Sequence, residues 1–393
     1  MERARASIQG HCERPDMSTP IISHAENDLL FDEGGRAYID LFSAYGTVFL
    51  GHCHPRITAA VRDQLARAWT TGGMPTRLFE EARAEVEGFF HESRTLAGFC
   101  STGMEASEYA IRIARVSTGR AEILGFDRNM HGKSLATACL SWNNRDGIKL
   151  PQVHRMPFLP HQDEAEILRA TEELLSRRTV SAVFVEPIQG SGGGHEPSRA
   201  FLNALFQMCR STGTLVVFDE VLTGFYRTGT PFFFSTLDVI PDIVLIGKAM
   251  ANGFPISGVM VPNYVEITGP MLRGSTYAGN PLACRAVTAT LREMAAMDLA
   301  NMVSAIHAHI HTAFSSLGQC GISVRGKGAI WILDVQDMRR AARAVEEIRR
   351  RGVCVGFNGT HVRIMPAATI RMENLTAACN VVREVLEQES AHA

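Results

Sequence analysis

Three short, almost uniformly apolar segments constrain the fold of this chain more than any other feature: Val180–Val185, Leu215–Phe218 and Ile243–Ile246. Segments of this length are too short for surface helices, and strands that are buried on both faces of a parallel sheet have this composition. A helical pattern over Arg199–Cys209 separates the first two segments. Strands that alternate with helices predict an α/β fold with right-handed connections around a mostly parallel sheet.

A polar residue follows each of these segments. Glu186 follows the first, Asp219 the second, and Lys248 comes two residues after the third. Ligands of open α/β sheets bind beyond the carboxyl ends of the strands, so these residues are expected at one ligand-binding rim. Each alone is equally well explained as an ordinary strand end at a solvated edge, but the three together favour a site. A reaction that needs a lysine imine also has few candidates, because the only lysines are Lys133, Lys149, Lys248 and Lys327.

The sequence Ser-Thr-Gly-Met at 101–104 runs directly into a helical pattern. The first turn of a helix exposes backbone N–H groups and the positive end of the helix dipole, which together favour phosphate binding. The same residues also suit a plain helix cap, so this signal is weak by itself.

The two ends of the chain are organised differently. Residues 1–25 lack periodicity and are expected to form an arm, whereas Leu29–Leu41 has the pattern of a hairpin. After about residue 285 the pattern changes to a long helix, short strands near Val324 and Ile330–Val335, and a helix over Met338–Arg351. We therefore predict an N-terminal arm that is also part of a small domain (1–57), a large domain (58–284) and a C-terminal small α+β domain (285–393).

Composition argues against several classes of function. The net charge of −2 gives no basic excess for nucleic acid or an anionic membrane surface. Met1–Pro15 has no apolar core of a secretory signal, and no apolar run reaches the roughly 18–20 residues of a membrane span. Nine cysteines without a C-x-x-C pair favour free thiols in a reducing compartment, so we expect a cytoplasmic protein.

Two local patterns allow other interpretations. Gly190–Gly194 is glycine-rich but lacks the Lys-Ser/Thr of a P-loop, so a plain loop is favoured over a nucleotide-phosphate site. His52 and His54 are two residues apart, so on a strand both side chains would lie on the same face, as those of two metal ligands can. No nearby acid or cysteine pair completes such a site, so a structural turn is favoured and no metal is expected.

Five longer motifs occur in the order and at the spacing of one known family. They are Gly51–Pro55 (G-H-C-H-P), Ser101–Ala106 (S-T-G-M-E-A), Phe218–Gly229 (F-D-E-V-L-T-G-F-Y-R-T-G), Pro241–Ile256 and Gly274–Ala283 (G-S-T-Y-A-G-N-P-L-A). Over about residues 30–370 the chain resembles the class III, omega-aminotransferase-like, pyridoxal-phosphate-dependent aminotransferases. Several long motifs in register are far more specific than one glycine-rich loop. The resemblance implies fold type I: a large domain with a mostly parallel, seven-stranded sheet flanked by helices, and a smaller α+β domain.

The resemblance also implies roles for individual residues. Lys248 would form the internal aldimine with pyridoxal 5'-phosphate and later move the proton, while Asp219 would pair with the pyridine nitrogen. Thr276 would reach the phosphate of the neighbouring subunit, which makes the site a property of a homodimer. Arg363 matches an arginine that binds a substrate carboxylate, a task that suits a planar guanidinium. The other implied cofactor positions are Thr102, Gly103, Met104, Met130, His131, Glu186 and Val221, and the other substrate positions are Tyr45 and Ser191.

Three positions depart from the family pattern. Met130 stands where an aromatic residue usually stacks on the cofactor ring, although a thioether can still contact a ring. Leu222 replaces a glutamine that bonds the phenolic oxygen of the cofactor. Ser191 replaces a glutamate that masks the arginine in one half-reaction, so Arg363 cannot be gated in that way. These changes bear on the substrate more than on the reaction.

The expected function is ping-pong transamination from an amino acid donor to an aldehyde or ketone acceptor. Because Ser191 is uncharged, we favour an acceptor whose carbonyl is remote from a carboxylate. The alternatives are another reaction on the same fold, by an aminomutase, racemase or decarboxylase, and a cofactor-binding protein without catalysis. The expected partners are the two small-molecule substrates and a second copy of the chain, with no nucleic acid and no membrane.

Overall fold

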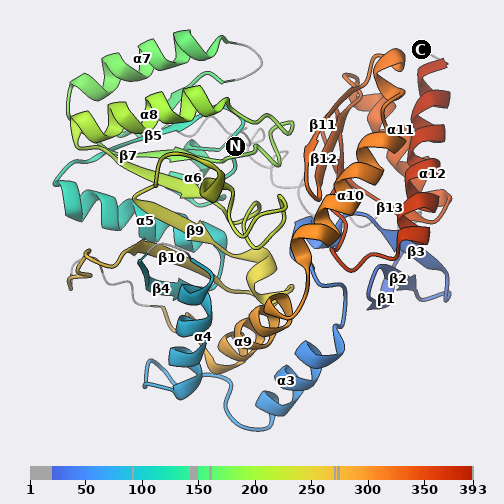
Figure 1. Cartoon of the computed structure of the whole chain (residues 1–393), viewed down its shortest axis with the longest axis horizontal. Coiled ribbons are helices and arrows are strands. Elements are labelled where there is room, and N and C mark those ends of the chain that lie inside the picture. The colour runs from blue at the N-terminus through green and yellow to red at the C-terminus, as the bar shows by residue number, and fades with distance from the viewer. Residues whose placement is uncertain are drawn as a thin grey trace, which may run out of the picture.

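A seven-stranded sheet with helices on both faces forms the larger part of the molecule (Figure 1). The computed structural model describes residues 20–90, 93–141, 149–158, 162–269, 271 and 275–391. The strand order is β4 (Arg94–Cys100), β10 (Ser257–Pro262), β9 (Ile243–Ile246), β8 (Leu215–Asp219), β7 (Val180–Val185), β5 (Glu122–Phe126) and β6 (Val153–Met156). Only β10 is reversed, since it pairs antiparallel with both β9 and β4. The predicted mostly parallel sheet is confirmed.

The three apolar segments are the strands β7, β8 and β9, as predicted, and they are neighbours in the sheet. One face of these strands packs against α5 (Gly103–Thr118), and the other packs against α8 (Arg199–Thr212). On β7, Phe184 lies in the apolar cluster with α5, while the next residue, Val185, lies in the cluster with α8. Helices on both faces explain why these strands are apolar throughout instead of alternating.

Local capping fixes the start of α5, the helix that begins at the predicted phosphate turn. The Oγ1 atom of Thr102 accepts a hydrogen bond from the backbone N–H of Glu105 at 3.2 Å, and the left-handed Gly119 (φ 68°) ends the helix. The other helices of this part are α3 (Pro55–Leu65), α4 (Arg77–Gly88), α6 (Leu135–Cys139), α7 (Glu164–Ser176), η2 (Phe233–Thr236), η3 (Lys248–Ala251) and α9 (Pro281–Ala295). None of the described helices is long and apolar enough to cross a membrane.

The remaining elements form two four-stranded sheets and their helices. One sheet joins β11 (Ser323–Lys327), β12 (Ile330–Asp334), β15 (His361–Ile364) and β14 (Gly356–Asn358); the other joins β1 (Ile22–Glu26), β2 (Leu29–Asp32), β3 (Ala37–Asp40) and β13 (Val353–Cys354). The helices are α2 (Ser43–Gly46), α10 (Leu299–Ala313), η4 (Leu317–Cys320), α11 (Met338–Arg350) and α12 (Met372–Ala391). Figure 1 shows the blue N-terminal strands beside the red helix α12. The domain boundaries near 57 and 284 stay a prediction.

Two expectations about these elements were wrong in part. The N-terminal arm includes a strand, β1, because antiparallel pairing with β2 holds a segment that has no clear pattern of its own; residues 1–19 lie outside the described part of the chain. The long helix expected after residue 285 is two helices, α9 and α10. The carboxylate of Asp298 accepts a hydrogen bond from the backbone N–H of Asn301 and starts the second helix. The expected hairpin is confirmed as β2 and β3.

Candidate active site

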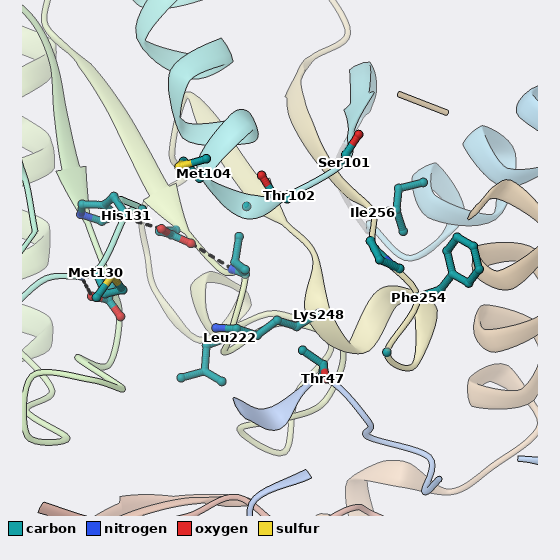
Figure 2. Close-up of a pocket in the computed structure, with 17 residues that line it drawn as sticks. Thr47, Ser101, Thr102, Met104, Met130, His131, Leu222, Lys248, Phe254 and Ile256 are labelled. Carbon is teal, nitrogen blue, oxygen red and sulfur yellow. Dashed lines mark hydrogen bonds and ion pairs between the residues drawn. The ribbon is translucent and has the colours of Figure 1, made fainter. Parts of the chain in front are cut away.

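A cavity of about 390 Å³ lies at the carboxyl ends of β8 and β9, beside the N-terminus of α5 (Figure 2). The polar residues predicted at the carboxyl ends of the strands therefore face a cavity. Nine of the residues predicted for catalysis or the cofactor line this cavity: Thr102, Gly103, Met104, Met130, His131, Glu186, Asp219, Val221 and Lys248.

Lys248 lies two residues after β9, and its side chain points into the cavity (Figure 2). Its backbone is left-handed (φ 44°), a conformation that non-glycine residues rarely adopt and that often marks functional sites. Burial lowers the pKa of its ammonium group, while the carboxylates of Asp219 and Glu186 act in the opposite direction. A lysine with a lowered pKa is more often the neutral amine, which is the nucleophilic form.

Two buried carboxyl groups face the same cavity. The Oδ2 atom of Asp219 lies 2.8 Å from Nδ1 of His131, and its Oδ1 atom accepts the backbone N–H of Val221 at 3.1 Å. Glu186 accepts the backbone N–H of Met130, and burial raises the pKa of its carboxyl group. A carboxylate with two hydrogen-bond donors is a suitable counter-charge for a cationic group in the cavity.

The N-terminus of α5 forms the opposite wall. Gly103 and Met104 are the first residues of this helix, so their N–H groups have no partner one turn earlier. A Cβ atom at Gly103 would lie 3.2 Å from Cγ1 of Val221, so a larger residue here would require the side chain of Val221 to shift by a few tenths of an ångström. Unpaired N–H groups and the helix dipole favour an anionic group such as a phosphate here.

Arg363 and Tyr45 lie outside the lining of this cavity. Arg363 is 5% exposed, and its guanidinium carbon lies 5.5 Å from the ring centre of Phe42 and 5.9 Å from that of Tyr45. Its Nη2 atom contacts the sulfur of Met365 at 3.9 Å, its Nε atom has no partner, and no carboxylate of the described residues pairs with it. Burial lowers the pKa of this group. A buried cation without an anion is a candidate binder of a ligand carboxylate.

Ser191 and Thr276, which were also predicted for the site, lie outside the lining of the main cavity. Ser191 lines a separate cavity of about 440 Å³ with Arg128 and Arg155, and its carbonyl oxygen accepts the side-chain amide of Asn358 at 2.9 Å. Among the described residues, no hydrogen bond or ion pair joins Ser191 to Arg363, the residue predicted to bind a substrate carboxylate. Thr276 is exposed, and its carbonyl oxygen accepts the hydroxyl of Thr70 at 3.4 Å.

The positions that depart from the family pattern differ in their surroundings. Met130 and Leu222 both line the main cavity. Leu222 fills the space beside Gly190, where a Cβ atom would lie only 2.1 Å from Cδ2 of the leucine. The leucine also belongs to a small apolar cluster that contains Met365, so it joins the wall of the cavity to the loop after β15.

Two further residues, Thr47 and Arg227, are placed at or beside the cavity by tertiary contacts and were not predicted from the sequence. Thr47 lines the cavity from the N-terminal segment. Arg227 is fully buried and donates hydrogen bonds to the carbonyl oxygens of Gly46 at 2.8 Å and Pro366 at 2.6 Å. Arg227 thereby links the N-terminal segment at Gly46 to the segment at Pro366 beside the cavity. Its place within the quoted F-Y-R-T-G motif was a usable signal, whereas nothing local marked Thr47.

His52 and His54, whose spacing resembles that of metal ligands, each lie near a carboxylate. Nε2 of His52 lies 2.8 Å from Oδ2 of Asp40, and Nε2 of His54 lies 3.9 Å from Glu293. Among the described residues, no group of three histidine, cysteine, aspartate or glutamate side chains could hold a metal ion.

Comparison with known proteins covers almost the whole chain. The family model for Aminotransferase class-III matches residues 13–386. The acetylornithine aminotransferase of Halalkalibacterium halodurans is 31% identical over 95% of this chain and 96% of that protein. The [LysW]-aminoadipate semialdehyde/glutamate semialdehyde transaminase of Sulfolobus acidocaldarius is 31% identical over 93% and 94%. The solved ornithine aminotransferase of Toxoplasma gondii, described with partial occupancy of PLP, superposes with a TM-score of 0.86 at 26% identity, covering 100% of this chain and 95% of that one.

Proposed function

This chain belongs to the class III aminotransferases, and from that premise we propose that the cavity around Lys248 is where it transfers an amino group from an amino acid to an aldehyde or ketone. One observation carries the assignment. Lys248, Asp219 and the N-terminus of α5 meet in a single cavity, although they come from distant parts of the sequence. An amine nucleophile, a counter-charge and an anion site are the groups that a transaminase needs together.

The residues of the cavity fit pyridoxal 5'-phosphate, the cofactor of this family. When bound, it supplies an electron sink for the amino group of the substrate. The Nζ atom of Lys248 would hold the cofactor covalently and would carry the proton that leaves the substrate carbon. Asp219 provides the anion that stabilises a protonated ring nitrogen, and the N–H groups of Gly103 and Met104 receive the phosphate. Val221 and Met130 line the cavity where they can contact the faces of the ring.

Product analysis tests the proposed reaction. The purified protein is supplied with cofactor, a panel of amino acids and a panel of keto acids and aldehydes. We expect one donor molecule to be deaminated for each acceptor molecule that is aminated. Loss or inversion of the amino acid without an acceptor would instead indicate a decarboxylase or racemase. Cofactor binding with no chemistry on any donor would contradict catalysis.

Replacement of Arg363 by alanine is expected to impair the amino acid half-reaction selectively. The unpaired guanidinium is proposed to bind the carboxylate of the donor, and loss of one partner of a buried ion pair costs about 2–5 kcal/mol. The second half-reaction is expected to be spared if its acceptor has no carboxylate. Stopped-flow absorbance follows the two half-reactions separately.

The exposed Arg169 provides a matched control, because Arg169→Ala removes the same side chain at the surface, where it pairs with Glu166. Equal losses in both half-reactions of Arg363→Ala would indicate one carboxylate site shared by donor and acceptor. Unchanged rates in both would show that Arg363 only stabilises the fold.

We also propose a homodimer in which Thr276 contacts the phosphate bound by the partner. Its exposure and its position outside the lining of the main cavity support this assignment. Mixed dimers of Lys248→Ala and Thr276→Ala subunits would then have one site with both changes and one with neither. Recovery of about half the native activity is expected from this symmetry, measured after co-expression with two different tags. Absence of any recovery would contradict the shared site.

The cellular setting that we propose is the cytoplasm. Six of the described cysteines have free thiols: Cys53, Cys209, Cys284, Cys320, Cys354 and Cys379. Burial also raises the pKa of the Cys284 and Cys379 thiols to about 12, so these groups stay protonated and unreactive. Free thiols of this kind are typical of proteins in reducing compartments.

A further inference from the structure

A chain of buried hydrogen bonds runs from Asp219 into the protein, away from the cavity. Oδ2 of Asp219 lies 2.8 Å from Nδ1 of His131, and Nε2 of His131 lies 3.1 Å from Nδ2 of Asn129. Oδ1 of Asn129 accepts from Nε2 of Gln189 at 2.8 Å. His131, Asn129 and Gln189 are each at most 2% exposed. The hydrogen-bonded side chains beyond Asp219 are therefore shielded from solvent.

Two backbone carbonyl groups fix the direction of every bond in this chain. Nε2 of Gln189 also lies 2.7 Å from the carbonyl oxygen of Asp127, which can only accept, so this atom of Gln189 must be the amide nitrogen. Its partner on Asn129 is then the amide oxygen. The other amide atom of Asn129 is the nitrogen, as its second contact confirms: the carbonyl oxygen of Phe184 at 3.4 Å.

The donor and acceptor roles in this row of hydrogen bonds determine the protonation state of His131. Because Asn129 donates to Nε2, this ring nitrogen must carry a lone pair and no proton. The single ring proton is then on Nδ1, where it is donated to Asp219. A second proton on Nε2 would face an N–H donor inside the protein, and burying two opposed donors is unfavourable.

We propose that Asn129 and Gln189 are positioning residues that hold His131 as the neutral tautomer with its proton on Nδ1. Asp219 then receives one neutral hydrogen bond from His131 and keeps its full negative charge toward the cavity, where Glu186 and Lys248 interact with it electrostatically, as the buried Glu220 also does. An imidazolium in place of the neutral ring would neutralise much of that charge. The assignment of the tautomer follows from the geometry alone. Its effect on the cofactor depends on the proposed function.

Gln189 also connects this chain to the glycine-rich turn that follows it. Its carbonyl oxygen accepts the N–H groups of Gly192 at 3.1 Å and Gly194 at 2.9 Å, and its own N–H donates to the carbonyl oxygen of His195 at 3.0 Å. These hydrogen bonds hold the backbone of Gln189 in place. The side chain of Gln189 is thereby positioned to donate to Asn129. This gives residues 190–194 a structural role in the site.

The tautomer is measured directly by nitrogen NMR of protein labelled with ¹⁵N-histidine and free of cofactor, with His131→Gln to identify the resonances. We expect one protonated and one unprotonated ring nitrogen for His131, with the proton on Nδ1. In Asn129→Asp, the new carboxylate accepts from Nε2, so both nitrogens are expected to be protonated. Asn380→Asp, an exposed change on α12, is the matched control and is expected to leave the signals unchanged.

Two protonated nitrogens, or a proton on Nε2 alone, in the unaltered protein would overturn the proposal even if no variant folds. With cofactor bound, Asn129→Asp is also expected to shift the visible absorption band and to lower turnover on the order of tenfold, the lower end of the effect of the outer partners of metal-binding histidines. The neutral tautomer in a protein without transaminase activity would leave the proposal intact and contradict the proposed function instead.

Discussion

Replacement of Asp219 by asparagine is expected to leave cofactor binding largely intact but to remove most of the turnover. The change preserves the shape of the side chain and removes the negative charge that stabilises a protonated ring nitrogen. Loss of one charge from a buried pair costs about 3–5 kcal/mol, which corresponds to a rate loss between about a hundredfold and a few thousandfold. Single-turnover kinetics with a saturating amino donor measure this loss without interference from product release.

The exposed Asp238 supplies the control for this variant, because Asp238→Asn makes the same chemical change at the surface. Cofactor content is determined in parallel, so that a loss of binding is not mistaken for a loss of rate. A single-turnover rate within a few-fold of the unaltered protein would contradict the role of Asp219 as the counter-charge.

Replacement of Lys248 by alanine is expected to abolish covalent attachment of the cofactor and to remove nearly all turnover. The side chain is the only lysine in the cavity lining, so no neighbour can take over as nucleophile. Loss of the proton carrier alone is worth about 10²–10⁴-fold in rate, and loss of the attachment adds to this. Absorbance after gel filtration reports attachment, and the donor half-reaction reports the rate.

Lys327→Ala is the matched control, because Lys327 forms an ion pair with Glu196 at 2.6 Å away from the cavity lining. This control is expected to retain both attachment and rate. Covalent cofactor that persists in Lys248→Ala would contradict the assignment of the cavity.

Much of this site could be predicted from sequence because its parts follow local patterns. Apolar segments of four to six residues give strands, and the parallel topology brings their carboxyl ends together, which places Asp219 and Lys248 at one rim. Thr102 and the residues after it have the pattern of a helix start, which indicates the anion site. Each of these inferences needs only neighbours along the chain and one rule of topology.

The rest of the site depends on loops whose shapes are set by tertiary contacts. The side-chain amide of Asn129 donates to His131 and accepts from Gln189, which lies sixty residues away in sequence. Arg227 is held by carbonyl groups from both ends of the chain, so its burial has no local cause. The motif alone places Ser191 at the position of a gating glutamate, whereas the turn after Gln189 places it in the lining of another cavity.

The central claim, that Lys248 carries the cofactor in this cavity, is tested most directly by borohydride reduction of the cofactor-loaded protein, followed by proteolysis and mass spectrometry. The account predicts one modified peptide, with the cofactor on Lys248. The other lysines are the controls within the same sample: Lys133 and Lys149 are exposed, and Lys327 is paired with a glutamate. A cofactor adduct on one of those three residues, with Lys248 unmodified, would contradict the account.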